Sequence, residues 1–170
     1  MRIRHQLTYA APADEVHRML TDPAFRERVC EALDTLNHDV TVDAGQDAGS
    51  AATVRIDMAQ RVRGVPAFAR KVVGEQTRVV QTETWTDARH ARLRLEIPGK
   101  PGHVEGDIVL EDAEDAGAGS SGTVETFTGE VTVSVPLVGG KLENVVSGLF
   151  TAGMDTEREV GTAWLAGERA

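Results

Sequence analysis

The chain has 170 residues, of which 41% are hydrophobic, and this length favours one domain (residues 1–170) with a core of its own. Its formal net charge of −9 argues against nucleic acid as a partner, because a nucleic-acid binder gathers lysine and arginine on one face. A single cysteine excludes an intramolecular disulfide, and no apolar run is long enough to cross a membrane, so we expect a cytoplasmic protein.

The N-terminal part begins with a strand pattern and continues with two short helices. Residues 2–10 alternate between apolar and polar, which predicts a half-buried strand with His5 on its apolar face. Pro12 and Pro23 each suit the first position of a helix, and the apolar spacing after each of them predicts one short helix. His5 is interpreted either as a hydrogen-bonded histidine of the sheet wall or as a polar anchor for a ligand.

Six further strands are predicted in the middle of the chain. They cover residues 36–44, 51–60, 77–87, 91–98, 103–112 and 122–135. Most of their connections contain glycine, proline or aspartate and are short enough for antiparallel hairpins, which predicts a meander. The stretch 61–76 is longer, and its apolar spacing around Pro66 predicts a short helix there.

The last stretch, residues 137–166, has the pattern of one long amphipathic helix. Its apolar residues recur at helical spacing and form a single stripe. The middle of that stripe contains only Ala152, Gly153 and Thr156, so a sheet beneath it would meet little side-chain volume. The sequence therefore predicts a cavity under the middle of this helix.

The order of one strand, two short helices, six strands and one long helix predicts an α+β fold with helices on one face of an antiparallel sheet. The segments 9–16 (YAAPADEV) and 19–25 (MLTDPAF) resemble the START-like superfamily, also called the SRPBCC or polyketide cyclase-like group. The segment 135–143 (VPLVGGKLE), with Trp164-Leu165, is similar to an actinobacterial branch, the DUF2505 family. This resemblance implies a helix-grip fold, in which seven bent antiparallel strands wrap around the long C-terminal helix.

Candidate catalytic residues are few. The five histidines lack the spacings that place two imidazoles on one metal ion, so we expect no metal and no cofactor. Strand 77–87 carries Val79, Gln81, Glu83 and Trp85 on one face and threonines on most of the other, and either face can point inward. If Glu83 points inward, its carboxylate must be hydrated, paired or shifted in pKa, and it is then a candidate acid or ligand anchor.

Candidate ligand-binding residues come from the inward rows of the strands and from the stripe of the last helix. Aromatic residues make up only 4% of the chain, so an aliphatic ligand is favoured over a stacked ring. The same side chains would equally suit an ordinary packed core. The candidates are Trp85, Leu95, Ile108, Phe127, Val131, Leu149, Gly153 and Thr156.

Charged residues separate between the two ends of the predicted meander, because alternate turns lie at opposite ends. One end carries acidic residues that include Asp43, Asp47, Asp87, Asp112, Glu114 and Asp115, whereas the other carries all three lysines. Both ends could simply be solvated, or the basic end could attract an anionic head group or an acidic lipid surface. In the resembled superfamily the cavity opens at this basic end, which makes the candidate portal residues Arg63, Val65, Phe68, Lys71, Val72 and Lys100.

Three functions are compatible with these sequence patterns. The leading hypothesis is non-catalytic binding of a small apolar or amphipathic molecule, lipid-like or polyketide-like, between the sheet and the last helix. The second is a cofactor-independent cyclase or aromatase in which Glu83 or His5 is the general acid or base, as the resemblance to the cyclase branch implies. The third is a co-chaperone-like interaction module, which requires an exposed apolar patch.

Overall fold

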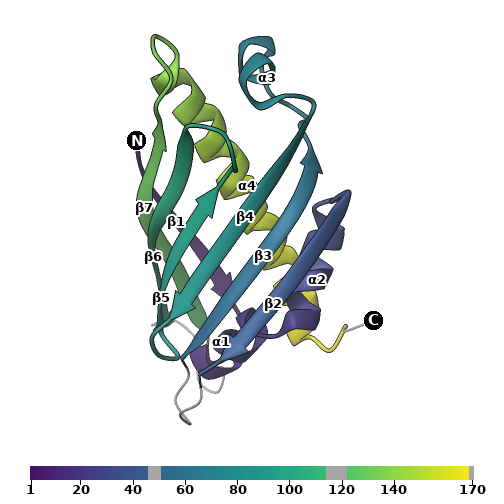
Figure 1. Ribbon diagram of the computed structural model, residues 1–170. Helices are drawn as coiled ribbons and strands as arrows, with labels where there is room; N and C mark the ends of the chain where they lie inside the picture. The colour runs from purple at the N-terminus through teal and green to yellow at the C-terminus, as the bar shows by residue number, and fades with distance from the viewer. Residues whose placement is uncertain (46–50, 114–121, 169–170) are drawn as a thin grey trace.

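The computed structural model describes residues 1–45, 51–113 and 122–168 (Figure 1). In chain order the elements are β1 (Arg2–Tyr9), α1 (Ala13–Leu20), α2 (Pro23–Ala32), β2 (Asn37–Ala44), β3 (Ala52–Arg61), α3 (Ala67–Val73), β4 (Gln76–Trp85), β5 (His90–Glu96), β6 (Gly102–Asp112), β7 (Thr123–Val133) and α4 (Gly139–Leu165). This is the predicted order of elements, with ends that differ by a few residues. The predicted turns at 46–50 and 114–121 lie outside the described residues.

The strands form a single antiparallel sheet in the order β1-β7-β6-β5-β4-β3-β2. The predicted meander from β2 to β7 is therefore confirmed, and β1 pairs with β7 rather than with its chain neighbour β2. Figure 1 shows α4 crossing one face of the twisted sheet, with α1 and α2 near the same face. Helices α1 and α2 thus carry the chain from one edge strand of the sheet to the other.

A pair of glycines brings β6 and β7 close together beneath α4. Gly106 and Gly129 lie opposite each other in the sheet register. A Cβ atom added to Gly106 would lie 2.6 Å from the Cα atom of Gly129, and one added to Gly129 would lie 2.6 Å from Cζ of Phe127. No side chain fits at either position, and glycines inside strands are typical of places where a sheet bends.

Helix α4 packs tightly at its C-terminal end, around Gly161 and Trp164. A Cβ atom added to Gly161 would lie 2.9 Å from Cε1 of Tyr9 and 3.0 Å from Cε of Met19, so the helix backbone lies directly against β1 and α1. Further along, the rings of Trp164 and Phe25 meet edge to face with centroids 5.6 Å apart. The open space beneath α4 therefore lies before this end, under the turns up to Glu157.

The buried face of α4 differs from the predicted stripe in the middle of the helix. Phe150 and Met154 are buried there, whereas Leu149, at the centre of the predicted stripe, is 51% exposed. The ring of Phe150 contacts Phe127 of β7, with centroids 4.8 Å apart. The helix is rotated so that Phe150 and Met154 point inward, because these side chains bury more apolar area than glycine and threonine do. Among the described residues, no helix is both long and apolar enough to cross a bilayer.

Candidate functional site

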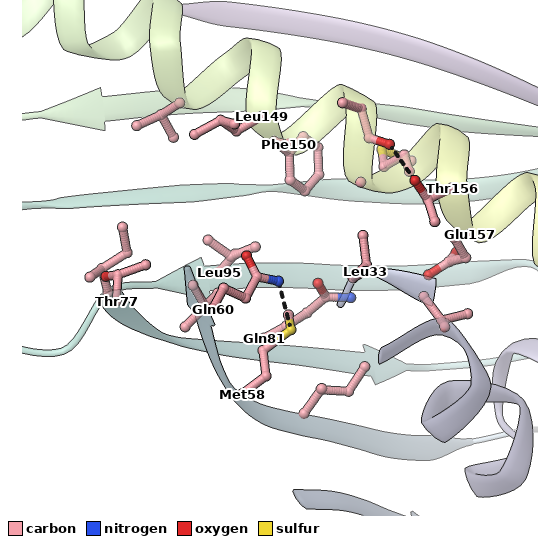
Figure 2. Close-up of a pocket in the computed structure, with 18 of the residues that line it drawn as sticks. Leu33, Met58, Gln60, Thr77, Gln81, Leu95, Leu149, Phe150, Thr156 and Glu157 are labelled. Carbon is pink, nitrogen blue, oxygen red and sulfur yellow. Dashed lines mark hydrogen bonds between the residues drawn. The ribbon is translucent and has the colours of Figure 1, made fainter. Parts of the chain in front are cut away.

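A cavity of about 370 Å³ lies between the sheet and α4. This volume falls within the range of about 300 to 1,000 Å³ that is typical of small-molecule sites. Figure 2 shows Leu149, Phe150, Thr156 and Glu157 of α4 on one side, across from Met58, Gln60, Gln81 and Leu95 of the strands. The wall is mainly aliphatic and is completed by Ile56, Val79, Leu93, Ile97, Ile108, Val145 and Val146.

The small residues of α4 account for this space. Ala152, Gly153 and Thr156 all line the cavity, and a Cβ atom added to Gly153 would meet no other atom within 4 Å. Native interiors are otherwise packed as densely as organic crystals. The cavity therefore follows from the local sequence of the helix together with the bend of the sheet.

One end of the cavity opens to solvent beside α3. Arg61 and Arg63 line the cavity and are exposed to solvent. Leu149 on the facing helix also lines the cavity and is exposed. Val65, also in the wall, packs with Ala69 and Leu142 in a small apolar cluster of its own, which joins the α3 segment to the first turns of α4. Arg63 is paired with Asp34 at 3.0 Å. We call this end the mouth.

The opposite, inner end carries three glutamates and one arginine. Glu83 of β4, Glu125 of β7 and Glu157 of α4 all line the cavity. Arg26 of α2 is 1% exposed and does not line it. Its guanidinium donates hydrogen bonds to Oε2 of Glu83 and Oε2 of Glu157, both at 2.6 Å, and to the carbonyl oxygen of Leu20 at 2.7 Å. We call these four charged residues the inner cluster.

The inner cluster holds Glu125 in an unusual protonation state. Burial, reinforced by the negative charges of Glu157 and Glu83, raises the pKa of Glu125 to about 8, so its carboxyl group is mostly protonated at neutral pH. Burial also raises the pKa of Glu157, against the opposing effect of Arg26. Although burial disfavours its charge, Arg26 has a pKa above its ordinary value because Glu157 and Glu83 surround it. One permanent cation therefore faces three acidic groups.

Residues 4–165 match the family model described as a protein of unknown function, DUF2505. The chain belongs to the DUF2505 family. It is 24% identical over 164 residues to an uncharacterized protein of Mycobacterium tuberculosis, with 92% of each chain covered. The sequence resemblance to DUF2505 is thus confirmed.

Solved structures similar to this DUF2505 protein share its fold. One is the Zhui aromatase/cyclase from Streptomyces sp. R1128, with 16% identity, a TM-score of 0.59 and coverage of 96% of this chain and 92% of that one. Another is a START superfamily protein from Mycobacterium smegmatis, with 13% identity, a TM-score of 0.56 and coverage of 96% and 98%. The fold of the DUF2505 protein is therefore the predicted helix-grip, START-like fold.

The predicted ligand-binding residues of the DUF2505 protein separate into two groups. Leu95, Ile108, Leu149, Gly153 and Thr156 line the cavity. The other three are buried outside its lining and belong to the packed core, which removes them from the proposed site: Trp85, Phe127 and Val131. They point inward like the first group, but α1, α2 and the inward side chains of α4 cover that part of the sheet.

The predicted portal residues also separate. Arg63 and Val65 line the mouth, whereas Phe68 and Lys71 lie exposed on α3 outside the lining. Lys100 borders a separate cavity of about 40 Å³ between β5, β6 and α4. The side chain of Val72 and the acidic turn residues Asp47, Glu114 and Asp115 lie outside the part of the chain that the structure describes.

The two candidate catalytic residues are both engaged in other contacts. Glu83 points inward, which settles the orientation of β4, and its Oε1 accepts a hydrogen bond from Gln81 at 2.8 Å while its Oε2 accepts from Trp85 at 3.1 Å and from Arg26. His5 lies outside the cavity lining, with its Nε2 atom 3.0 Å from Oδ1 of Asp155. Its position fits the interpretation of a hydrogen-bonded wall histidine.

Sequence reasoning missed Arg26, Glu125 and Glu157. Two of these three had a visible signal. Arg26 follows Phe25 on the apolar face of α2, and Glu125 alternates with Phe127 on the inward face of β7. A charged residue at a position that helical or strand periodicity assigns to the core predicts a buried partner. The pattern does not identify that partner.

Proposed function

We propose that this protein binds a small apolar or amphipathic molecule in the cavity between the sheet and α4. The observation that supports the proposal is the cavity itself, about 370 Å³ with a mainly aliphatic wall. An apolar molecule in a space of this size would gain dispersion contacts with the wall. Binding without chemistry is the leading form of the proposal, and the cytoplasmic location predicted from the sequence is part of it.

Replacing Gly153 by leucine is expected to abolish binding of an apolar probe without unfolding the protein. The added side chain would enter open space in the cavity, and leucine has a higher helix propensity than glycine by up to about 1 kcal/mol. Isothermal titration with decanol measures the affinity, which should fall at least tenfold, and urea unfolding measures the stability.

Gly148→Leu is the matched control for this variant. Gly148 is exposed on the same helix, lies outside the cavity lining and also has no atom within 4 Å of an added Cβ. It should gain similar helix stability and keep the affinity of the parent protein for decanol. Equal decanol affinity in Gly153→Leu and Gly148→Leu would contradict the proposed site.

The outer surface beside the mouth supports a second part of the proposal, contact with an anionic membrane. Leu137, in the β7–α4 connection, is fully exposed, and Phe68 on α3 is exposed as well. Both segments lie at the same end of the sheet (Figure 1). Arg70 and Lys71 on α3 add positive charge there. Exposed apolar side chains beside basic ones are typical of surfaces that rest on acidic lipid head groups.

The double variant Arg70→Glu, Lys71→Glu is expected to weaken binding to vesicles of phosphatidylcholine and phosphatidylserine. Each basic residue near such a surface contributes about 1 kcal/mol, so removing two should lower the affinity by tenfold or more, and added salt should weaken the parent protein. Vesicle co-sedimentation at low and high salt measures this. The matched control is the double variant Arg4→Glu with Arg18→Glu, which makes the same charge change on β1 and α1. If both double variants co-sediment with vesicles to the same extent at low salt, the outer surface beside the mouth has no role in membrane contact.

Acid catalysis is a second candidate function, favoured by the protonation state of Glu125. A carboxyl group with a pKa of about 8 that faces a cavity can donate a proton to a bound molecule at neutral pH. In this form of the proposal Glu125 replaces Glu83 and His5, whose carboxylate and imidazole are engaged elsewhere. A Glu125→Gln variant should then lose turnover of any substrate found.

A further inference from the structure

We infer that the molecule bound in the cavity carries an amine or other cationic group at its inner end, held against Glu125 and Glu157. This inference rests on the proposed function, because it names the chemical class of the ligand for the same site. It follows from the charges, the free acceptor atom and the shape of the inner cluster.

Among the described residues, none at the inner end of the cavity places a positively charged side chain on its surface. Glu83, Glu125 and Glu157 border the space, while Arg26 lies behind them and outside the lining. The guanidinium of Arg26 is already shared between Oε2 of Glu83 and Oε2 of Glu157. Among the described lining residues, the other cationic side chains are those of Arg61 and Arg63, and both belong to the mouth.

Glu125 also offers a hydrogen-bond acceptor that the protein does not saturate. The residue is 1% exposed, and within the described part of the chain its Oε2 atom has no hydrogen bond of normal geometry. The hydroxyl of Tyr9 lies beside this carboxyl group and interacts with it, but a carboxylate oxygen can accept a second hydrogen bond. A buried polar atom without a partner costs about 1 to 3 kcal/mol, so native structures normally provide one. An ammonium group has three donors and a positive charge, and it would satisfy both this atom and the missing charge.

The remaining wall defines the rest of the ligand. Between the inner cluster and the mouth the lining is mainly aliphatic, with Ile56 and Leu95 on the sheet and Val146 on α4. A cationic amphiphile would place its head at the inner cluster and its tail toward the mouth. A carboxylate amphiphile that bound with its head at Arg61 would press its apolar tail against three acidic side chains. The predicted anionic head group is therefore less suited to this cavity than an amine.

The groups around Glu125 decide how binding responds to pH. Tyr9 of β1, Arg26 of α2, Glu83 of β4 and Glu157 of α4 act on it, and Cys30 of α2 also borders the cavity. A bound ammonium favours the ionised form of Glu125, so binding should release the proton from this carboxyl group. The affinity for an amine should accordingly rise between pH 6 and pH 9, while the affinity for a neutral alcohol should stay level.

The test compares decylamine, decanol and decanoate by isothermal titration of the intact protein at pH 7. We expect decylamine to bind at least tenfold more tightly than decanol, and decanoate to bind most weakly. In Glu125→Gln the ratio of the decylamine and decanol affinities should fall at least fivefold. Glu27→Gln removes an exposed charge from α2 and should keep the parent ratio, which controls for attraction to an acidic protein.

The outcomes separate this inference from the proposed function. If decanol binds and decylamine binds no more tightly, the inference is wrong while the cavity remains a binding site. The same holds if Glu125→Gln keeps the parent ratio. If Glu125→Gln does not fold, the second variant, Glu157→Gln, decides in the same way. If none of the three probes binds, the proposed function itself fails.

Discussion

Replacing Arg26 by methionine is expected to lower the free energy of unfolding by about 3 to 5 kcal/mol. Arg26 is buried and is bonded at 2.6 Å to Glu83 and to Glu157. Without its guanidinium, these carboxylates and Glu125 would remain together in the interior with no cation. Breaking one side of a buried charge network is therefore far more damaging than losing a surface ion pair. Urea unfolding followed by circular dichroism measures the loss.

The control for this variant is Arg78→Met. Arg78 is paired with Asp57 on the exposed face of the sheet, so its loss should change stability much less. Adding Glu83→Gln and Glu157→Gln to Arg26→Met should restore part of the lost stability, because the uncompensated charges are then removed. An Arg26→Met protein as stable as Arg78→Met would show that the inner cluster does not depend on its cation.

Raising the pH from about 5 to about 8.5 is expected to destabilise the protein, and Glu125→Gln should remove most of that effect. The folded state raises the pKa of Glu125 from its ordinary value of 4.5 to about 8, so between these values the folded chain keeps a proton that the unfolded chain releases. The stabilisation is complete below the ordinary pKa and is lost as the pH rises through the folded value. At about 1.4 kcal/mol per pKa unit, the loss is on the order of 3 to 5 kcal/mol.

Urea unfolding of the parent and Glu125→Gln proteins at several pH values measures this difference. Glu157 contributes in the same direction, because burial raises its pKa too, so a smaller slope should remain in the variant. The difference between the two stability curves isolates Glu125 from the titration of histidines and surface carboxylates. Parallel curves over this range would show that Glu125 has an ordinary pKa in the folded protein.

The strands and their order could be predicted because their signals are local. Alternation along 77–87 and the turn residues around it place β4 within a few residues, and short connections require antiparallel neighbours. The pairing of β1 with β7 has no local signal, because it joins segments from opposite ends of the chain. The rotation of α4 was missed for a related reason. Helical periodicity does not take side-chain size into account, whereas packing favours turning Phe150 rather than Gly153 toward the core.

The site could be predicted only where one element determines it. The small residues of α4 pointed to the cavity, because a gap in side-chain volume is visible within a single helix. The inner cluster could not be predicted, because Arg26, Glu125 and Glu157 come from three elements far apart in the sequence. Their contact depends on how α2, β7 and α4 pack together, which no spacing within one segment encodes.

Nuclear Overhauser effects between bound decanol and methyl groups of the protein test the proposed binding site most directly. The cavity wall offers methyl groups on both layers, with Ile56 and Leu95 on the sheet and Val146 and Leu149 on α4. We expect decanol to contact methyl groups of both layers at once, and we expect these contacts to be lost in Gly153→Leu. Contacts confined to exposed Leu137, or none at the cavity wall while decanol binds, would contradict it.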